Sequence, residues 1–133
     1  MEEKVIWTNG CFDVLHRGHI ELFKYAKSLG NELVVGIDTD FKVSQDKGAD
    51  RPYNNLQDRM FALQSIKYID KVISFNSRKE LESLISLYSP DILLVGSDWR
   101  DGDIVGKQFA REVCFFERIT QYSTTNILTN ERK

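Results

Sequence analysis

Two histidines near the start of the chain have the spacing of a phosphate-binding site. His16 and His19 lie three residues apart, after an apolar run and a turn that contains Gly10. Residues at positions i and i+3 share one face of a helix, and the first helical turn presents unpaired N–H groups and a partial positive charge. The two imidazoles and the helix N-terminus are therefore expected to bind the oxygens of one phosphate.

Two other roles are open for this pair. The histidines could be metal ligands together with Cys11, but the chain has no further histidine and no Cys-x-x-Cys motif, so we predict no metal site. They could also be ordinary polar residues at a helix start. The apolar strand and the glycine turn before them supply the context that a phosphate-binding motif requires, and they favour the first interpretation.

The composition is typical of one globular domain. The 133 residues are 41% hydrophobic and 29% charged, which predicts a single domain over residues 1–133. A net charge of −2 disfavours a nucleic-acid partner, whose phosphates call for a basic excess. We expect a cytoplasmic protein with no membrane partner, because no apolar run reaches spanning length and the first residues do not resemble a signal peptide. Cys11 and Cys114 are expected to be reduced thiols.

Apolar, β-branched runs alternate with segments of helical periodicity. The runs cover residues 5–7, 33–37, 72–75, 92–95 and 113–116, and the helical segments cover residues 20–29, 59–69 and 78–88. This alternation predicts an α/β, Rossmann-like domain in which a five-stranded parallel sheet has helices on both faces. Gly30 is expected to end the first helix. The polar segment 39–55 is longer than a usual connection, which indicates a functional loop or a partly helical excursion.

Polar residues follow four of the five predicted strands. Ligands of open parallel sheets bind beyond the carboxyl ends of the strands, where the strand order reverses. The groups expected to converge there are Gly10 with the histidines, Asp38 with Asp40, residues 96–99, and Arg118 with residues 123–125. Ser123 and Thr124 could simply cap a last helix, but Arg118 nearby favours an anion site.

Four motifs spread along nearly the whole chain resemble the nucleotidylyltransferase superfamily that includes the cytidylyltransferases. They are Thr8-Asn9-Gly10-Cys11-Phe12-Asp13 with Leu15-His16-x-Gly18-His19, Lys47-Gly48-x-x-Arg51-Pro52 with Arg59, Gly96-x-Asp98-Trp99, and Ser123-Thr124-Thr125. Within that superfamily the chain resembles the adenylyltransferase domain of ADP-heptose synthases. It also resembles the glycerol-3-phosphate cytidylyltransferases in its length, in Asp98-Trp99 and in the position of Arg118.

The resemblance implies roles for individual residues. It makes His16, His19 and Lys47 the catalytic groups. The residues that it implies for nucleotide binding are Gly10, Cys11, Phe12, His16, His19, Arg59, Asp98, Arg118, Ser123 and Thr124. The residues that it implies near the acceptor are Asp13, Arg17, Asp38, Lys47 and Trp99. Arg17 could instead point into solvent.

The expected reaction transfers a nucleoside monophosphate from ATP or CTP to a sugar phosphate or polyol phosphate and releases pyrophosphate. Heptose 1-phosphate with ATP is the first expectation, and glycerol 3-phosphate with CTP is the alternative. Such transfers need positioning and charge stabilisation and no covalent intermediate. Mg²⁺ is expected to arrive with the nucleoside triphosphate, and the resemblance implies a homodimer. A nucleotide-binding sensor without turnover is the competing hypothesis from another class.

Overall fold

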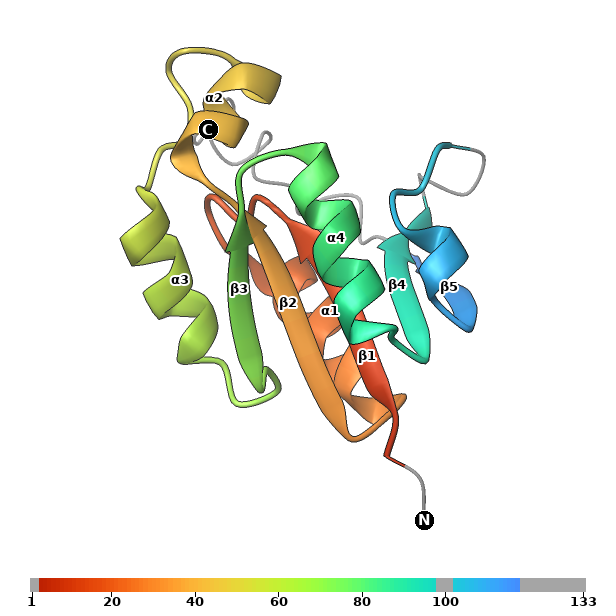
Figure 1. Ribbon diagram of the computed structural model, residues 1–133. Helices are drawn as coiled ribbons and strands as arrows, with labels where there is room; N and C mark the ends of the chain where they lie inside the picture. Colours follow the sequence, from red (N-terminus) through yellow and green to blue (C-terminus); the bar gives the residue numbers. More distant parts are fainter. Residues whose placement is uncertain (1–2, 98–101, 118–133) are drawn as a thin grey trace.

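The computed structural model describes residues 3–97 and 102–117, and these residues form a parallel β-sheet covered by helices (Figure 1). The strands are β1 (Val5–Gly10), β2 (Glu32–Asp38), β3 (Lys71–Phe75), β4 (Ile92–Gly96) and β5 (Glu112–Phe116). Their order across the sheet is β3-β2-β1-β4-β5, and every adjacent pair is parallel. The predicted α/β Rossmann-like fold with a five-stranded parallel sheet is thereby confirmed.

Alternate side chains of the strands build two cores, one on each face of the sheet. Ile6, Val35 and Leu94 belong to one core, and their neighbours Trp7, Val34 and Leu93 belong to the other. This alternation follows from the two-residue period of a strand. Because both faces are buried, the strands are apolar throughout, as the sequence predicted.

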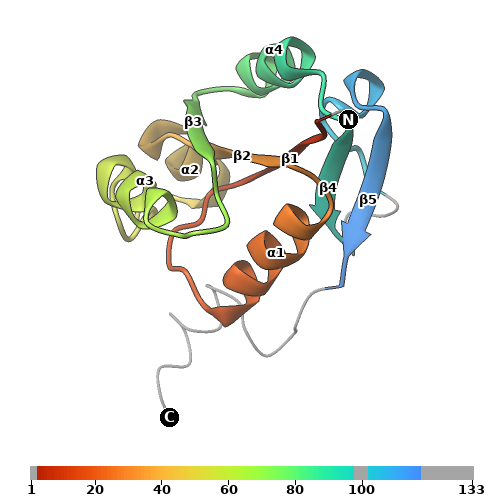
Figure 2. The same cartoon turned by 90° about the horizontal axis from the view of Figure 1, so that it is seen from below.

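Three helices cover the two faces. α1 (Arg17–Ser28) and α3 (Leu56–Gln64) pack on one face through Phe23, Ala26 and Leu63, while α4 (Arg78–Tyr88) packs on the other through Leu81 and Ile85. Figure 2 shows α1 and α4 on opposite sides of the sheet. The chain reaches the fifth strand through a short 3-10 turn, η2 (Lys107–Phe109).

The polar segment after β2 contains a helix, α2 (Asp40–Lys47). Thr39 caps it by accepting a hydrogen bond from the Lys42 amide, and Gly48 ends it with a φ of 113°. Only glycine adopts such a φ without strain, so the helix must end there. The predicted partly helical excursion is therefore found, although Lys47 is the last residue of a helix and not part of a loop.

Gly30 directly follows the C-cap residue of α1, so the helix ends where the sequence predicted, but not through a left-handed glycine. α1 ends at Ser28, Leu29 is the C-cap residue in right-handed helical conformation, and Gly30 does not adopt the left-handed region. Glycine is needed at this position for space, because a Cβ atom would lie 2.8 Å from the carbonyl oxygen of Lys4 and 2.8 Å from Ile6 Cδ1. The close approach of the α1–β2 turn to β1 explains the residue.

α3 also differs from its predicted range. It begins at Leu56, three residues before the predicted start, and its last residue is Gln64. Asn55 sets the beginning, since its side chain accepts a hydrogen bond from the Asp58 amide. Successive turns that link Ile66 to Leu63 and Ile69 to Ile66 replace the predicted last helical turn. α4 matches its predicted range.

Candidate active site

The histidine pair lies at the start of α1, next to the point where the strand order reverses. β1 pairs with β2 on one side and with β4 on the other, so the chain leaves β1 at the crevice where such sheets bind ligands. The turn after Gly10 places Phe12 at a φ of 46° and buries its ring against Phe23 and His19. The strand end and this buried ring fix the position of the histidines.

Each histidine uses one ring nitrogen to build the helix start. His16 is the N-cap residue, and its Nδ1 accepts a hydrogen bond of 3.0 Å from the Gly18 amide. Nδ1 of His19 accepts a hydrogen bond of 3.1 Å from the His16 amide. A neutral imidazole that accepts at Nδ1 carries its proton on Nε2. With Nδ1 occupied in this way, Nε2 is the nitrogen through which each ring can donate to a phosphate oxygen.

The two imidazoles lie almost on top of one another. Their ring centroids are 3.9 Å apart and their planes differ by 32°. At this separation both rings can reach the same phosphate group. The structure therefore brings the predicted pair together as a unit at the N-terminus of α1.

Asp13, predicted to lie near the acceptor, is buried and bonded to the protein. Its side chain is fully buried, and its carboxylate accepts hydrogen bonds from Arg51 Nε at 2.8 Å, from the Tyr53 amide at 2.7 Å and from the Asn54 amide at 2.8 Å. Burial raises the pKa of this carboxyl, but the Asn54 and Tyr53 amides and Arg51 together outweigh burial and hold the pKa below its ordinary value. The contacts favour a positioning role for Asp13.

Replacing Asp13 by asparagine is expected to lower the free energy of unfolding at pH 7 by about 2 kcal/mol, since hydrogen bonds to a charged group are lost. A carboxyl with a lowered pKa stabilises the fold above the pKa of the unfolded chain, and this stabilisation is lost as the pH falls through the folded value. The stability of the variant should therefore fall less steeply than that of the wild type below about pH 4. Urea unfolding at several pH values measures both effects. If the free energies of unfolding of the variant and the wild type changed in parallel at all pH values, the lowered pKa of Asp13 would be contradicted.

Arg59, predicted to bind the nucleotide, is also buried. Its Nε donates to the Asn54 carbonyl, its Nη1 donates to the carbonyls of Cys11 and Asp38, and its Nη2 contacts Asp40 Oδ1 at 2.7 Å. Its side chain has no exposed surface. All three guanidinium nitrogens are thus used to join the ends of β1 and β2 to α2 and to the segment before α3, which favours a structural role over contact with a triphosphate.

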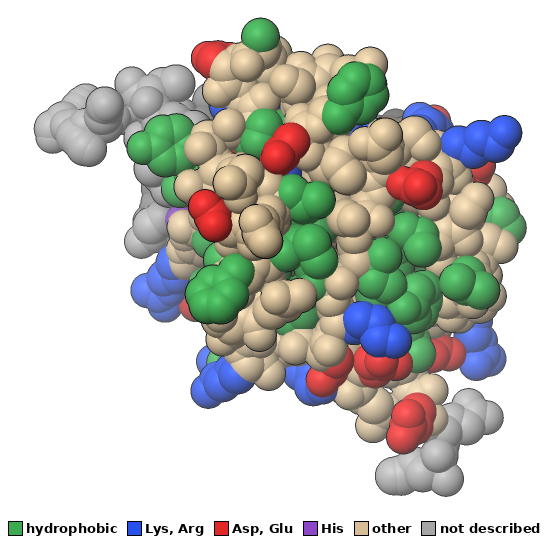
Figure 3. All heavy atoms as spheres, turned by 60° about the vertical axis from the view of Figure 1, so that its left-hand side comes forward, with side chains coloured by type: hydrophobic (Ala, Val, Ile, Leu, Met, Phe, Trp, Pro, Cys, Tyr) green, Lys and Arg blue, Asp and Glu red, His purple; other side chains and the backbone are tan. Residues whose placement is uncertain are grey.

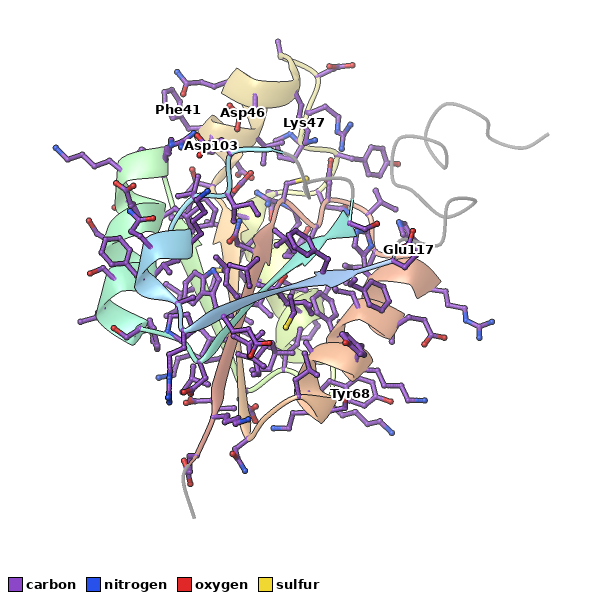
Figure 4. All side chains as sticks on the ribbon, turned by 90° about the vertical axis from the view of Figure 1, so that its right-hand side faces the viewer. Phe41, Asp46, Lys47, Tyr68, Asp103 and Glu117 are labelled. Carbon is purple, nitrogen blue, oxygen red and sulfur yellow. The ribbon has the colours of Figure 1, made fainter. Side chains whose placement is uncertain are left out.

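Asp38 ends β2, and Lys47 ends α2, the helix that follows it. Burial raises the pKa of the Asp38 carboxyl above its ordinary value; the positive charges of Lys42, Lys47 and Arg59 oppose this shift, and Asp46 adds to it. Figure 4 shows Lys47 and Asp46 beyond the carboxyl ends of the strands, with Tyr68 at the opposite end of the molecule. An exposed ammonium group near a half-buried carboxylate can bind a phosphate whose sugar or polyol carries hydroxyl groups.

The remaining predicted positions are exposed or lie elsewhere. Arg17 is exposed, and its Nε pairs with Glu21 at 3.1 Å on the surface of α1. Its charge is therefore paired within its own helix. Cys11 and Gly10 are partly buried beside the histidine turn. Asp98, Trp99, Arg118, Ser123 and Thr124 lie outside the described residues. Within the described ranges, no group of three or more histidine, cysteine or acidic side chains could hold a metal ion.

Sequence reasoning gave no role to Arg51 and Asn54, which both contact Asp13. Asn54 donates through its backbone to the carboxylate and through its side-chain nitrogen to the Asp13 carbonyl, at 2.9 Å. The signals in the sequence are the polar composition of segment 39–55 and, for Arg51, the motif Lys47-Gly48-x-x-Arg51-Pro52. They indicate a functional segment, but they do not reveal a partner about forty positions away.

A family model described as cytidylyltransferase-like matches residues 7–130. The chain belongs to the cytidylyltransferase-like family. This match confirms the superfamily and the nucleotidyltransferase class predicted from the sequence.

Curated relatives resemble almost the whole chain. It is 39% identical over 127 residues to the bifunctional protein HldE of Helicobacter hepaticus, and 41% identical over 124 residues to the protein of that name from Campylobacter fetus. These alignments cover 96% and 93% of this chain but only 26% and 27% of the relatives. The chain thus spans about a quarter of the length of the curated relatives that it matches.

Two solved structures share the fold. A lipopolysaccharide core biosynthesis protein from Thermoplasma volcanium superposes with a TM-score of 0.70 at 23% identity, covering 87% of this chain and 98% of that one. A pantoate-beta-alanine ligase from Francisella tularensis has a TM-score of 0.60 at 19% identity, covering 95% of this chain and 68% of that one. At these identities the likeness supports the architecture alone. Among the described residues, no helix has the length and apolarity to cross a membrane.

Proposed function

We propose that this protein transfers a nucleoside monophosphate from a nucleoside triphosphate to a phosphorylated sugar or polyol and releases pyrophosphate. The observation that carries the proposal is the pair of adjacent imidazoles at the N-terminus of α1, each of which accepts a backbone N–H at Nδ1. Family membership supports the reaction class.

The preferred substrates in this proposal are ATP and heptose 1-phosphate. The sequence resembles the adenylyltransferase domain of ADP-heptose synthases, and relatives named HldE match nearly the whole chain. Glycerol 3-phosphate with CTP is the second candidate, and the residues that favour it are Asp98-Trp99 and Arg118.

In the proposed reaction, an oxygen of the acceptor phosphate attacks the α-phosphorus in line with the leaving group. A bond forms between these two atoms, the bond from the α-phosphorus to the bridging oxygen breaks, and pyrophosphate leaves with the bonding electrons. His16 and His19 donate hydrogen bonds to the phosphate oxygens on which charge accumulates, and Lys47 neutralises charge between acceptor and α-phosphate. Asp38 accepts hydrogen bonds from hydroxyl groups of the acceptor or of the ribose.

We propose that Mg²⁺ enters with the triphosphate. The donors at the histidine turn are imidazole and amide N–H groups, which suit phosphate oxygens, whereas Mg²⁺ prefers oxygen ligands. The ion would therefore be held by phosphate oxygens and water, and it would share the negative charge of the substrate. We also propose a homodimer, a cytoplasmic location and a single domain over residues 1–133, all three on the basis of the sequence.

Pyrophosphate release from ATP, CTP, GTP and UTP with a panel of sugar and polyol phosphates tests the function. We expect release with ATP and heptose 1-phosphate. Release only with CTP and glycerol 3-phosphate would make these the substrates, and the proposed mechanism would still hold. Nucleotide binding without release, with any acceptor of the panel, would favour the sensor hypothesis.

The variant Arg118→Ala tests the predicted contact with the triphosphate. A guanidinium that binds phosphates equally in the ground state and the transition state affects KM more than kcat. We expect the KM for the nucleotide to rise about tenfold or more, with kcat within a few-fold of the wild type. An unchanged KM would remove Arg118 from the site and weaken the glycerol 3-phosphate alternative that it supports.

A further inference from the structure

Four residues form a buried polar contact between the histidine turn and the segment that follows Lys47. We call them the Asp13 clasp: the carboxylate of Asp13 and its donors Arg51, Tyr53 and Asn54. The side chain of Asp13 has no exposed surface and that of Arg51 is 16% exposed. A carboxylate with three donors is satisfied by the protein itself, so it is not available to a substrate.

The clasp is close in sequence to both proposed catalytic elements. Asp13 precedes His16 by three residues, and Arg51 follows Lys47 by four. The chain between Lys47 and Arg51 is closed by two hydrogen bonds, from the Gly48 amide to the Ser44 carbonyl and from the Arg51 amide to the Gly48 carbonyl. Because each residue spans at most about 3.5 Å, these short segments limit how far His16 or Lys47 can move relative to the clasp.

A second set of buried contacts supports the same segment. Arg59 donates to the Asn54 carbonyl and to the Cys11 carbonyl, which ties the end of the clasp back to the turn before Asp13. Its contact with Asp40 anchors the start of α2, the helix that ends at Lys47. One continuous hydrogen-bond network therefore holds the histidine turn, the start of α2 and the segment that follows Lys47.

We propose that Arg51 is a positioning residue, which acts through Asp13 to set where the Lys47 ammonium lies relative to the histidine pair. This inference rests on the proposed function. Arg51 Nε donates to the buried Asp13 carboxylate, so in this proposal its effect on the reaction passes through the placement of Lys47. A small displacement of a charge in such a site can lower the rate by up to about a hundredfold.

A double-mutant cycle between Arg51 and Lys47 tests the inference. We expect Arg51→Ala to lower kcat by about tenfold to a hundredfold, with the nucleotide Kd within a few-fold of the wild type. Arg51→Lys should recover part of the loss, because an ammonium can still reach the Asp13 carboxylate. If Arg51 acts through Lys47, the double variant should be no slower than Lys47→Ala alone. Losses that multiply would overturn the inference, because they would show that the two residues act independently.

Arg111→Ala is the matched control. It removes an arginine that pairs with Asp91 at 3.5 Å at the other end of the sheet, and it should leave kcat unchanged. Thermal unfolding of every variant checks that the chain is folded. If Arg51→Ala does not fold, Arg51→Lys is taken through the same cycle.

Amide hydrogen exchange tests the clasp without turnover. In Arg51→Ala, the amides of Gly48, Tyr53 and Asn54 should exchange faster, whereas amides of β1 and β2 should keep their protection. Unchanged exchange over residues 48–54 would overturn the inference whatever the enzyme does. If the wild type releases no pyrophosphate with any substrate pair, the proposed function fails, and the exchange measurement alone decides whether Arg51 holds the exit of α2.

Discussion

Replacing His16 or His19 by alanine is expected to lower the rate of pyrophosphate release at least about a hundredfold. Each imidazole donates through Nε2 to oxygens that gain charge as the bond to pyrophosphate breaks, and loss of one such donor typically costs a factor of about a hundred to a thousand. Steady-state kinetics with saturating nucleotide and acceptor measures the effect. Rates near that of the wild type in either variant would refute the proposed roles of these residues.

The structure allows a sharper test at His16, where alanine also removes the helix cap. The Nδ1 bond to the Gly18 amide contributes about 1 kcal/mol to the start of α1. Asparagine is a favoured N-cap residue, so its side-chain oxygen can replace Nδ1 while the variant lacks an Nε2 donor. His16→Asn should therefore keep the melting temperature of the wild type and still lose the activity. A normal rate in this variant would mean that His16 serves the helix alone.

Replacing Lys47 by alanine is expected to lower kcat about a hundredfold while the nucleotide Kd stays within a few-fold. Lys47 is the last residue of α2, and its positive charge acts on the Asp38 carboxyl. In the proposed reaction it neutralises charge between two phosphates once both substrates are bound, so it should stabilise the transition state more than the nucleotide complex. Isothermal titration with the nucleotide and steady-state kinetics separate the two effects.

Lys47→Arg should recover little activity, because a planar fork does not replace a compact ammonium. Lys67→Ala is a suitable control, since Lys67 is exposed in the turns between α3 and β3, near the amino ends of the strands. An equal loss of nucleotide affinity and rate in Lys47→Ala would assign Lys47 to nucleotide binding in place of the transition state. No change in either quantity would make it an ordinary surface lysine.

The sheet could be predicted from the sequence because its strands are buried on both faces. Runs such as residues 33–37 are apolar at every position, and this pattern can be recognised without knowing which strands pair. The caps were harder to predict. Asn55 caps α3, which begins at Leu56, three residues before its predicted start. Gly30 is required by the approach of Lys4, which no local pattern reveals.

The histidine pair could also be predicted, since both residues lie within one helical turn. The contacts of Asp13 and Arg59 could not be predicted in this way, because their partners are far away in the sequence. Both are charged residues next to a recognisable motif, and such residues are naturally assigned to a charged ligand. In the structure their charges are satisfied by Arg51, Asp40 and backbone groups, so they shape the site from within.

Apolar side chains are also exposed on the face that carries α2 and α3 (Figure 3). Phe41, Tyr53 and Phe61 are 57%, 71% and 72% exposed. Tyr53 is held through its backbone by Asp13, so its ring is displayed beside the segment that follows Lys47. Because the Tyr53 ring is exposed, packing in the core does not explain an aromatic residue at this position.

The cap of α1 bears on how selection has acted on this chain. Serine, threonine, aspartate and asparagine are the residues that best stabilise a helix start, and histidine is not among them. A lineage selected only for a stable fold would therefore drift from His16 toward one of these four. Under the proposed function, a histidine in this position gives up some stability in exchange for its second nitrogen, in the way that functional sites commonly trade stability for activity. Stability-guided redesign of this protein is therefore expected to replace His16 and to lose the proposed reaction with it.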